Sequence, residues 1–491
     1  MSTPVRVRIA PSPTGTLHLG TARTALYNFL YARRHDGAFV LRLEDTDEER
    51  SKDEYTADII AGLKWLGINW DEGPDIGGPY PPYKQTQKID HYDNMANQLI
   101  AKGLAYFAYE TPEELDALRE KQKNTNQAHR YDNSGRHLSE EDLKRYEAEG
   151  RAPMIRFKVE EPRVVSWHDA IKGEISVDTA DLGGDMVIVK SNGVAIYNFA
   201  VVVDDIDMKM THVIRGEDHI HNTAKQILLY EALGHEHPIF GHTALIQDTE
   251  HRKLSKRIHG ESVHIDNYRI LGYMPEAMVN YLAQMSWTPQ VEGGEAKEIF
   301  TLEEASKLFE LERVSKSAAV FDIQRLNWFN GHYIRSLPLD LITERSLPFL
   351  ESLNLSEYSR EQLEAIVDTV RSGLSLLNEV TEAVRFYFGD TLDVPAELRD
   401  EHLKTDNGKK ILSTMLNGLK DIPWADSQGC KKAVDKVGKE IGIKGKDLYW
   451  PLRVALSGST HGPDLGRMIS ILGEKRVKAR LESALNLCGQ C

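Results

Sequence analysis

Cysteine is scarce in this chain, with three residues in 491, at Cys430, Cys488 and Cys491. Three thiols cannot form a disulfide framework for so long a chain, so we expect it to fold by packing in a reducing cytoplasm. Cys488 and Cys491 have the spacing of metal ligands, but a tetrahedral thiolate site needs a second pair. The scarcity of cysteine therefore predicts no structural zinc, and we expect no other resident metal.

Long apolar runs are also missing. No segment approaches the ~18 apolar residues that a membrane helix needs, and the N-terminus leads into strand-like sequence without the apolar core of a signal peptide. Hydrophobic residues make up 41% and charged residues 27% of the chain, as in ordinary globular proteins. We expect a cytoplasmic protein with no membrane partner and, from its length, about three domains of ~150 residues.

Positive charge is in deficit, because the formal net charge is −15. This excludes nonspecific binding of nucleic acid through a general positive field, so any RNA contact must be local. Lys and Arg outnumber Asp and Glu roughly two to one in residues 431–480, where a solvated helical surface is the alternative interpretation. No Walker P-loop and no His-Glu-x-x-His motif is present, which leaves other phosphate-binding patterns to consider.

The first half of the chain has the pattern of a parallel sheet. Residues 5–9 alternate like a strand, 18–35 have helical periodicity, and 38–43 form a second strand pattern. Strand, helix and strand at this spacing predict a βαβ unit and an α/β, doubly wound, Rossmann-like fold. We expect this sheet to resume with a buried parallel strand at 197–203 and a strand at 212–216 that leads into a helix over 222–233.

A mixed α+β insert is expected to split that sheet. Helical patterns cover 54–66 and 86–102, and Thr111 begins a capping box for another helix. Short strands with a hairpin turn at Ser191-Asn192-Gly193 follow. From Phe300 onward helical periodicity dominates, which predicts an all-α C-terminal region.

Two segments could bind a nucleoside triphosphate. In Pro11–Thr21, glycines permit close backbone approach at a helix N-terminus, and His18 in its first turn could donate to phosphate. The alternative is a plain turn in which His18 only caps the helix. Lys253, Lys256 and Arg257 place three cations in five residues, which could neutralise departing pyrophosphate or could form a solvated face.

The two segments together resemble the paired signatures of class I aminoacyl-tRNA synthetases. Four further motifs make the resemblance closer: Arg8-Ile-Ala-Pro-Ser12, Leu43-Glu-Asp-Thr-Asp47, Tyr197 to Asp205, and Val213 to His219. With these, the chain resembles the bacterial-type glutamyl-tRNA synthetases over essentially its whole length. This resemblance implies ATP-dependent activation of L-glutamate to an adenylate and its transfer to the 2′-hydroxyl of the terminal adenosine of tRNA(Glu).

The resemblance also assigns site residues. Two arginines suit a substrate with two carboxylates, and a glutamate can meet its α-ammonium group. The resemblance also implies that Mg²⁺ accompanies ATP and that the activation of glutamate depends on bound tRNA. The implied glutamate-binding residues are Arg8, Ala10, Ser12, Glu44, Tyr197 and Arg215; the ATP-binding residues are His18, Gly20, Thr21, Glu217, Asp218, His219 and Lys256; the catalytic residues are His18, Lys253 and Lys256.

The chain departs from the family pattern in its insert. Some members carry a zinc knuckle there, but the corresponding stretch reads Tyr106-Phe-Ala-Tyr109, without cysteine. This supports the expectation of no structural zinc. The histidines at 235, 237 and 242 are expected to be ordinary loop residues.

The helical C-terminal region is expected to read the anticodon, because single-stranded bases are recognised by contacts to their edges. Family members that discriminate tRNA(Glu) from tRNA(Gln) carry an arginine at the position of Gly373. Glycine offers no side-chain hydrogen bond to a base, so we hypothesise that this enzyme also charges tRNA(Gln) with glutamate. Arg371 is the alternative anticodon contact.

We expect a monomer. A glutaminyl-tRNA synthetase is the nearest rival, but its family has a β-barrel anticodon domain; another adenylate-forming enzyme and a catalytically silent tRNA-binding protein are further alternatives. The expected domains are a catalytic domain at 1–84 and 197–235, an acceptor-binding insert at 85–196, a stem-contact domain at 236–330, and helical anticodon-binding subdomains at 331–390 and 391–491.

Overall fold

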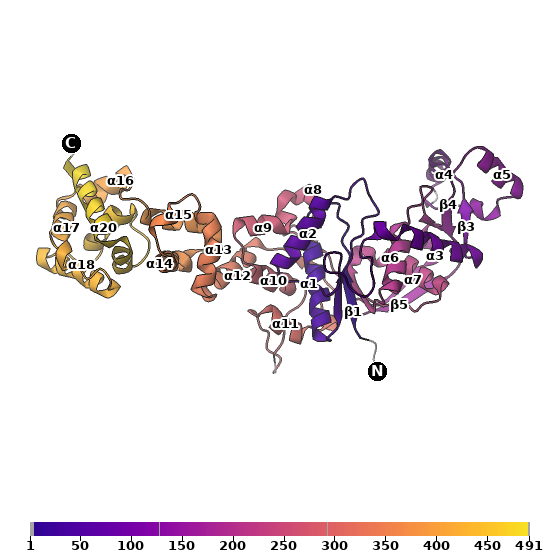
Figure 1. Cartoon of the computed structure of the whole chain (residues 1–491), viewed down its shortest axis with the longest axis horizontal. Coiled ribbons are helices and arrows are strands. Elements are labelled where there is room, and N and C mark those ends of the chain that lie inside the picture. Colours follow the sequence, from indigo (N-terminus) through magenta and orange to yellow (C-terminus); the bar gives the residue numbers. More distant parts are fainter. Residues whose placement is uncertain (1–3, 127, 292, 490–491) are drawn as a thin grey trace. The chain divides into compact units, whose positions relative to one another are not determined.

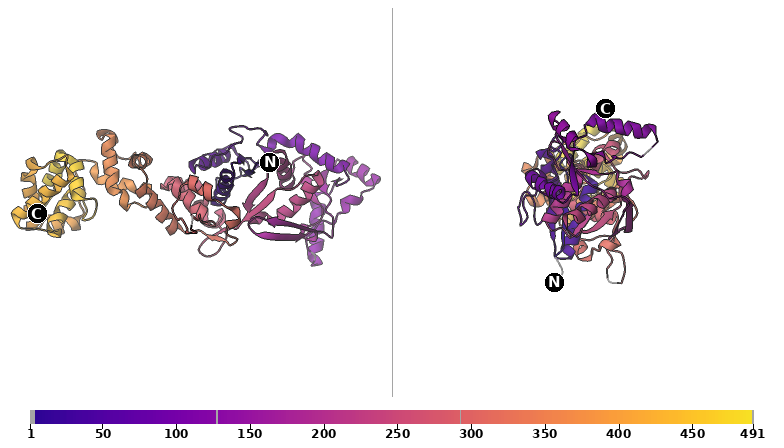
Figure 2. Two further views of the ribbon diagram at one scale, coloured as in Figure 1. Left: turned by 90° about the horizontal axis from the view of Figure 1, so that it is seen from below. Right: turned by 90° about the vertical axis from the view of Figure 1, so that its right-hand side faces the viewer.

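The computed structural model describes residues 4–126, 128–291 and 293–489. The chain divides into two compact units, one of residues 1–269 with 278–322 and the other of residues 270–277 with 323–491. The described strands all lie in the first unit, and the second, orange to yellow in Figures 1 and 2, is helical. The all-α C-terminal region is thereby confirmed, whereas the finer division into five domains stays a prediction.

The predicted βαβ unit is present at the N-terminus. It consists of β1 (Arg6–Ile9), α1 (Leu19–Arg34) and β2 (Ala38–Leu41), and the two strands pair in parallel from Arg6 opposite Ala38. A Cβ at Gly37 would lie 2.4 Å from the carbonyl oxygen of Val5, so only glycine lets the turn after α1 pass this close to the strand. That turn brings the chain from α1 directly into β2.

The sheet resumes after the insert, as predicted. β8 (His212–Gly216) and β9 (Ile239–Thr243) are parallel and are connected by α7 (Ile220–Leu233). Thr211 N–H donates to the Arg6 carbonyl at 3.0 Å, which joins the start of β8 to β1. This is the doubly wound, Rossmann-like catalytic fold that was expected.

One element of the catalytic half was predicted wrongly. Residues 197–203, expected as a buried parallel strand, belong to the helix α6 (Tyr197–Asp207). Its residues from Phe199 to Asp205 are all buried, including Asp204 and Asp205, so this stretch has no solvent-exposed face. A helix that is buried on every side and a central strand both give a continuous run of apolar residues in the sequence. Because valine is β-branched and favours strands, the run at 201–203 led to the prediction of a strand.

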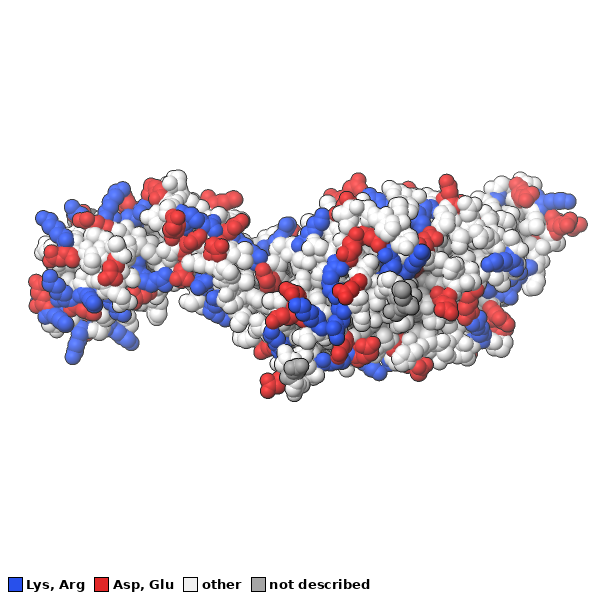
Figure 3. Space-filling model, turned by 60° about the horizontal axis from the view of Figure 1, so that its bottom comes forward, with Lys and Arg blue, Asp and Glu red and all other residues white. Residues whose placement is uncertain are grey.

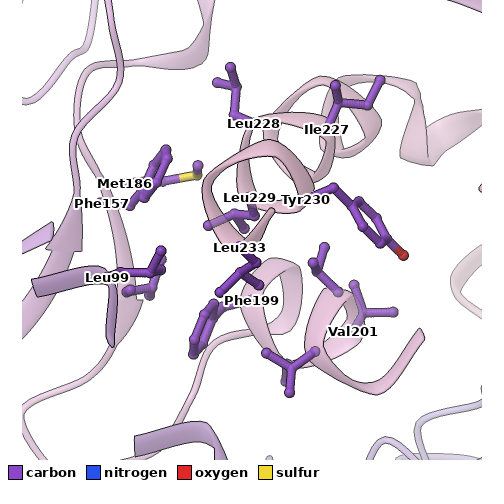
Figure 4. Packing of buried hydrophobic residues seen from close by; sticks show 14 of the residues in the cluster. Leu99, Phe157, Met186, Phe199, Val201, Ile227, Leu228, Leu229, Tyr230 and Leu233 are labelled. Carbon is purple, nitrogen blue, oxygen red and sulfur yellow. The ribbon is translucent and has the colours of Figure 1, made fainter. Parts of the chain in front are cut away.

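The insert shares its hydrophobic core with the catalytic half. Leu99, Phe157 and Met186 of the insert pack against Phe199 of α6 and Leu229 of α7 in one buried cluster (Figure 4). The β5 strand of the insert also pairs in parallel with β9, in a four-stranded sheet of order β6-β5-β9-β8. The insert is therefore anchored on α6, α7 and the catalytic sheet rather than hanging from a hinge.

The capping box predicted at Thr111 and the hairpin turn at 190–194 are both formed in the first unit, which contains further helices and strands. They are α2 (Asp53–Trp65), η1 (Gln85–Lys88), α3 (Ile89–Ala101), β3 (Ala105–Ala108), α4 (Pro112–Asn124), η2 (Ser134–His137), α5 (Glu140–Ala148), β4 (Met154–Phe157), β5 (Val164–Asp169), β6 (Gly173–Asp178), η3 (Thr179–Leu182), β7 (Met186–Val189), η4 (Glu217–His219), β10 (Ile246–Gln247), α8 (Lys256–His259), η5 (Gly260–Val263), α9 (Ile265–Leu271), α10 (Pro275–Gln284), α11 (Leu302–Leu308), η6 (Leu311–Arg313) and β11 (Ala319–Val320).

The second unit is a succession of helices, and α9 and α10 contribute residues 270–277 to it. Its helices are α12 (Ile323–Ser336), α13 (Leu339–Leu350), η7 (Leu355–Glu357), α14 (Arg360–Val370), η8 (Arg371–Gly373), η9 (Leu377–Glu379), α15 (Val380–Val384), η10 (Arg385–Tyr387), α16 (Ala396–Leu398), η11 (Arg399–Leu403), α17 (Asp406–Asn417), η12 (Leu419–Asp421), α18 (Ser427–Ile441), α19 (Lys446–Ser457) and α20 (Leu465–Gly489).

Candidate active site

A cavity of about 530 Å³ opens where β1 and β8 end, the place at which ligands enter sheets of this kind. The residues predicted for glutamate lie together on its wall, beside most of those predicted for ATP and the first lysine of the basic loop. The predicted residues that line it are Arg8, Ala10, Ser12, His18, Gly20, Thr21, Glu44, Tyr197, Arg215, Asp218, His219 and Lys253.

Arg8 reaches the cavity from the end of β1. Its Nε and Nη2 donate to the two carboxylate oxygens of Asp205 at 3.2 and 3.3 Å, and both side chains are buried. Burial alone would raise the pKa of Asp205, but the charges of Arg42 and Arg8 outweigh it and hold that pKa below its usual value. Asp205 thus stays ionised and fixes Arg8 edge-on, with Nη1 left for a ligand.

Glu44 follows β2 and is only 6% exposed. Its Oε1 accepts a hydrogen bond from Arg42 Nη2 at 3.1 Å, and Arg42 also bonds Asp205 at 2.6 Å. Burial raises the pKa of Glu44, although the neighbouring charges of Arg42 and Arg8 oppose this. A cationic group that entered the cavity would stabilise the carboxylate further, which suits Glu44 to an ammonium ligand.

Arg215 ends β8 and is held by four side chains. Nε donates to His242 Nε2 at 3.3 Å, Nη1 to the Tyr197 hydroxyl at 3.3 Å, and Nη2 to Thr223 and Gln226 at 2.8 and 2.7 Å. A guanidinium carries five N–H groups, so within the described part of the chain one N–H on Nη1 is uncommitted. Arg215 can therefore present a single, well-oriented donor to a carboxylate.

His18 caps the N-terminus of α1. Its Nδ1 accepts a hydrogen bond from the Gly20 N–H at 3.0 Å, which leaves the ring proton on Nε2. Burial, together with the charges of His264 and Lys253, lowers the pKa of His18 to about 4. His18 is consequently a neutral hydrogen-bond donor at pH 7, placed where the helix dipole also favours an anion.

The basic loop contributes one described cation to the cavity. Lys253 Nζ lies 3.0 Å from Asp218, and both side chains are about half exposed. Burial would raise the pKa of Asp218, but the hydrogen bond from Lys253 and the charges of His219 and Lys253 together outweigh it and lower that pKa. Lys256 begins α8, and its side chain lies outside what the structure describes.

Glu217 is not on the cavity wall. Its Oε1 accepts a hydrogen bond from the Leu245 N–H at 2.9 Å, and its Oε2 is ion-paired with Lys172. The residue predicted to contact ATP instead ties the insert to the segment after β9. The sequence pattern could not separate Glu217 from its neighbour Asp218, because the direction of each side chain depends on the η4 turn.

Sequence reasoning missed several residues that support the site. Arg23 lines the cavity from α1, is 2% exposed, and donates to Ser286 Oγ at 3.2 Å and to the Ala244 carbonyl. Its signal was a basic residue within the apolar stripe of a predicted helix. His242 was predicted to be an ordinary loop residue, which is wrong: it lies fully buried in β9 against Asp169 and Arg215.

The comparisons with known proteins agree with this site. Residues 4–328 match the family described as tRNA synthetases class I (E and Q), catalytic domain, and residues 341–485 match the Anticodon binding domain. A glutamate–tRNA ligase of Synechococcus sp. is 47% identical and covers 95% of this chain and 96% of its own. One of Natranaerobius thermophilus is 44% identical and covers 99% of both chains.

A solved structure extends the comparison to the fold. The crystal structure of a glutamate tRNA ligase from Elizabethkingia meningosepticum, in complex with its amino acid, is 32% identical, covers 99% of each chain and has a TM-score of 0.89. The chain belongs to the glutamate–tRNA ligase family. The expected class, reaction and use of ATP are thereby confirmed, and these relatives do not favour a glutaminyl-tRNA synthetase or a silent tRNA-binding protein.

A second cavity, of about 950 Å³, lies within the helical unit of this glutamate–tRNA ligase. Gly373 lines it, and a Cβ at this position would meet nothing within 4 Å. The aromatic side chains Phe386 and Phe388 also line it. Arg371 does not, because its Nε is ion-paired with Asp368 at 2.8 Å. On the face shown in Figure 3, basic and acidic side chains alternate over this unit.

Tyrosine hydroxyls tie together the segments of the insert around residues 106–137. The Tyr131 hydroxyl donates to Glu110 and accepts the Gly135 N–H at 2.7 Å, and the Tyr106 hydroxyl donates to Asp185 at 2.7 Å. Among the described residues, no group of His, Cys, Asp and Glu is arranged to hold a metal. Cys488 is buried, and Cys491 lies outside the described residues.

None of the described helices is long and apolar enough to span a membrane.

Proposed function

We propose that the first cavity binds L-glutamate and ATP side by side and joins them as glutamyl-adenylate. The observation that carries this proposal is the placement of Arg8, Arg215 and Glu44 on one wall, with His18 and Lys253 on another. Two fixed cations and one buried carboxylate match the two carboxylates and one ammonium of glutamate. Ala10, Ser12 and Tyr197 complete the amino-acid side of the cavity.

The phosphates of ATP are proposed to lie over the N-terminus of α1. His18 Nε2 donates a hydrogen bond there, Gly20 and Thr21 allow close backbone approach, and Lys253 with Lys256 neutralises pyrophosphate as it leaves. The glutamate α-carboxylate attacks the α-phosphorus, and the P–O bond to pyrophosphate breaks. Catalysis then rests on positioning and charge stabilisation, with no covalent enzyme intermediate.

Asp218 and His219, which also line the cavity, are proposed to contact the nucleotide, whereas the contact proposed for Glu217 requires that side chain to leave Lys172. Mg²⁺ accompanies ATP in this proposal. Because the described residues hold no three-ligand carboxylate group, the ion would be held by the phosphates and water, with Asp218 as the acidic side chain on the cavity wall.

The amino-acid assignment is tested by Arg215→Lys. Lysine cannot reproduce the planar guanidinium fork, so KM for glutamate in ATP–pyrophosphate exchange with bound tRNA should rise about tenfold or more. KM for ATP should change little. Arg33→Lys, in a partly exposed ion pair with Asp71, is the matched control and should behave as the parent enzyme. An unchanged KM for glutamate in Arg215→Lys would overturn the assignment.

We further propose that the enzyme aminoacylates tRNA(Glu) and also tRNA(Gln) with glutamate. The helical unit would receive the anticodon in the 950 Å³ cavity, where Phe386 and Phe388 can stack on unpaired bases. Gly373 leaves that wall without a side chain that reads a base edge. Arg371 would reach the anticodon only after releasing Asp368, so we assign it the lesser part.

Gly373→Arg tests the tRNA proposal, since the site has room for a side chain. The variant should lose charging of tRNA(Gln) by about tenfold or more while it keeps tRNA(Glu), because arginine supplies donors that distinguish base edges. Gly418→Arg adds the same charge outside the cavity and should change neither. If the parent enzyme places no glutamate on purified tRNA(Gln), the proposal fails.

The working form is proposed to be a cytoplasmic monomer. All six proposed amino-acid contacts line one cavity of a single chain. Light scattering of the purified enzyme should give the mass of a single chain, and with tRNA the mass of one chain plus one bound tRNA.

A further inference from the structure

Asp169 and His242 form a buried pair that makes no contact with the proposed substrates. Asp169 Oδ2 lies 2.5 Å from His242 Nδ1, and both side chains are fully buried. Asp169 ends β5 of the insert, whereas His242 lies in β9 of the catalytic sheet. The pair therefore connects the insert to the catalytic half directly behind Arg215.

The partners determine which ring nitrogen of His242 carries the proton. An ionised carboxylate can only accept, so Nδ1 donates to Asp169. A guanidinium can only donate, so Nε2 accepts the Arg215 Nε–H at 3.3 Å; the Thr223 hydroxyl, which can also donate, lies 3.0 Å from the same nitrogen. Asp169 thus selects the tautomer of His242 that gives Arg215 Nε an acceptor.

Asp169 itself cannot turn. Its Oδ1 accepts three backbone N–H groups, from Ile171 at 3.0 Å, Lys172 at 2.8 Å and His242 at 3.1 Å. The Oδ1 position must be an oxygen rather than an amide nitrogen, because three N–H groups donate to it. Oδ2 is consequently the atom that faces the imidazole.

We infer that Asp169 and His242 are positioning residues for glutamate binding: they orient the Arg215 guanidinium so that its uncommitted Nη1–H points at a substrate carboxylate. This inference rests on the role proposed for Arg215. Without an acceptor at Nε, the guanidinium keeps Thr223 and Gln226 at Nη2 but can pivot about that end and away from Tyr197, so the single donor that remains for the ligand is misdirected.

The same turn of the insert makes a second connection. Lys172, three residues after Asp169, is ion-paired with Glu217 and donates to the Lys316 carbonyl at 2.8 Å. Glu217 in turn holds the Leu245 N–H on the cavity wall. The 169–173 turn therefore supports two residues that line the cavity: Arg215 through Asp169, and Leu245 through Lys172 and Glu217.

Asp169→Asn is the discriminating variant. Because Oδ1 must remain an oxygen, the new amide nitrogen has to face His242 Nδ1, which forces the ring proton onto Nε2. An N–H then faces the Arg215 N–H, and a buried donor loses its acceptor. KM for glutamate should rise about tenfold or more in ATP–pyrophosphate exchange, while kcat and KM for ATP stay within about threefold.

His242→Gln is the rescue variant, because its amide can donate to Asp169 and accept from Arg215; it should keep KM for glutamate within about threefold of the parent. His242→Phe fills the space without either function and should raise KM as Asp169→Asn does. Glu174→Gln, in an exposed pair with His168 on the same hairpin, is the control and should leave all constants unchanged.

Thermal unfolding of each variant shows whether it is folded. If Asp169→Asn does not fold, the contrast between His242→Gln and His242→Phe decides the matter. An unchanged KM for glutamate in folded Asp169→Asn, or equal losses in His242→Gln and His242→Phe, would overturn the inference. If Arg215→Lys also leaves that KM unchanged, the proposed function of Arg215 fails; if Arg215→Lys raises it, only the positioning role fails.

Discussion

At the scale of single residues, most charged groups of the site are already paired with one another before a substrate binds. Arg42 is buried among Glu44, Asp204 and Asp205, with distances of 3.1, 3.5 and 2.6 Å. Arg8 shares Asp205, so the cations and anions of this wall nearly balance. A buried charge without a partner would be costly, and the network lets the arginines stay desolvated and oriented.

Three partly buried histidines, two of which, His18 and His219, line the cavity, give the first prediction. Burial is the main cause that lowers the pKa values of His18, His212 and His219 to about 4, from an ordinary value of 6.5. Between pH 6.5 and 4 the unfolded chain therefore binds protons that the folded chain does not, and folding stability falls as the pH falls. Thermal unfolding should be flat above about pH 7 and decline through that window.

Adenylate formation should not follow an ordinary histidine titration. His18 stays neutral and keeps its Nε2 donor down to about pH 5, so exchange activity should show no loss with a midpoint near 6.5. A midpoint near 6.5 that disappears in His18→Asn would contradict this account of the site.

At the scale of elements, α2 supports the phosphate-binding turn. Leu17 N–H, just before α1, donates to Asp58 of α2 at 2.7 Å. A Cβ added at Gly62 would lie 2.7 Å from Leu17 Cδ2, so α2 can approach this turn closely only because residue 62 has no side chain. The position of His18 therefore depends on a helix more than thirty residues further along the chain.

Gly62→Val should disturb that contact. The added methyl groups collide with Leu17, so the variant should lose about 1–3 kcal/mol of unfolding free energy and show a raised KM for ATP. Ala61→Val, on the exposed side of the same helix, adds a β-branched side chain without this clash and serves as the control. Urea unfolding and exchange kinetics of both variants give the comparison. Equal effects would show that α2 does not position the turn.

At the scale of the whole molecule, we expect stability to come from packing and hydrogen bonds. The described residues hold no candidate metal group, and the Tyr131, Glu110 and Gly135 contacts join the segments around 106–137. The formal net charge of −15 leaves tRNA binding to local surfaces.

Metal removal should separate folding from catalysis. Dialysis against EDTA should leave the unfolding temperature of the protein alone unchanged, because no structural ion is expected. ATP–pyrophosphate exchange should stop and should return when Mg²⁺, but not Zn²⁺, is added. A fall in unfolding temperature that only Zn²⁺ reverses would show a structural site.

Much of this could be predicted from the sequence because the signals were local. The turn before α1, the capping box at Thr111 and the helical periodicity after Phe300 each lie within one short segment. Residue types alone also indicated two arginines for two carboxylates. Local patterns gave the wrong element at α6, because complete burial removes the alternation of polar and apolar residues that identifies a helix. They could not show in which direction the Glu217 side chain points.

The sequence by itself determined the family and the reaction class, and most of the site residues predicted from it line the cavity. Only the tertiary structure decided how those residues are held, because their partners are distant in the chain: Arg8 meets Asp205 across 197 positions, and Asp169 meets His242 across 73. Hydrogen-bond geometry depends on atoms that folding brings together. For that reason His242, an ordinary histidine in the sequence, becomes the residue that gives Arg215 its orientation.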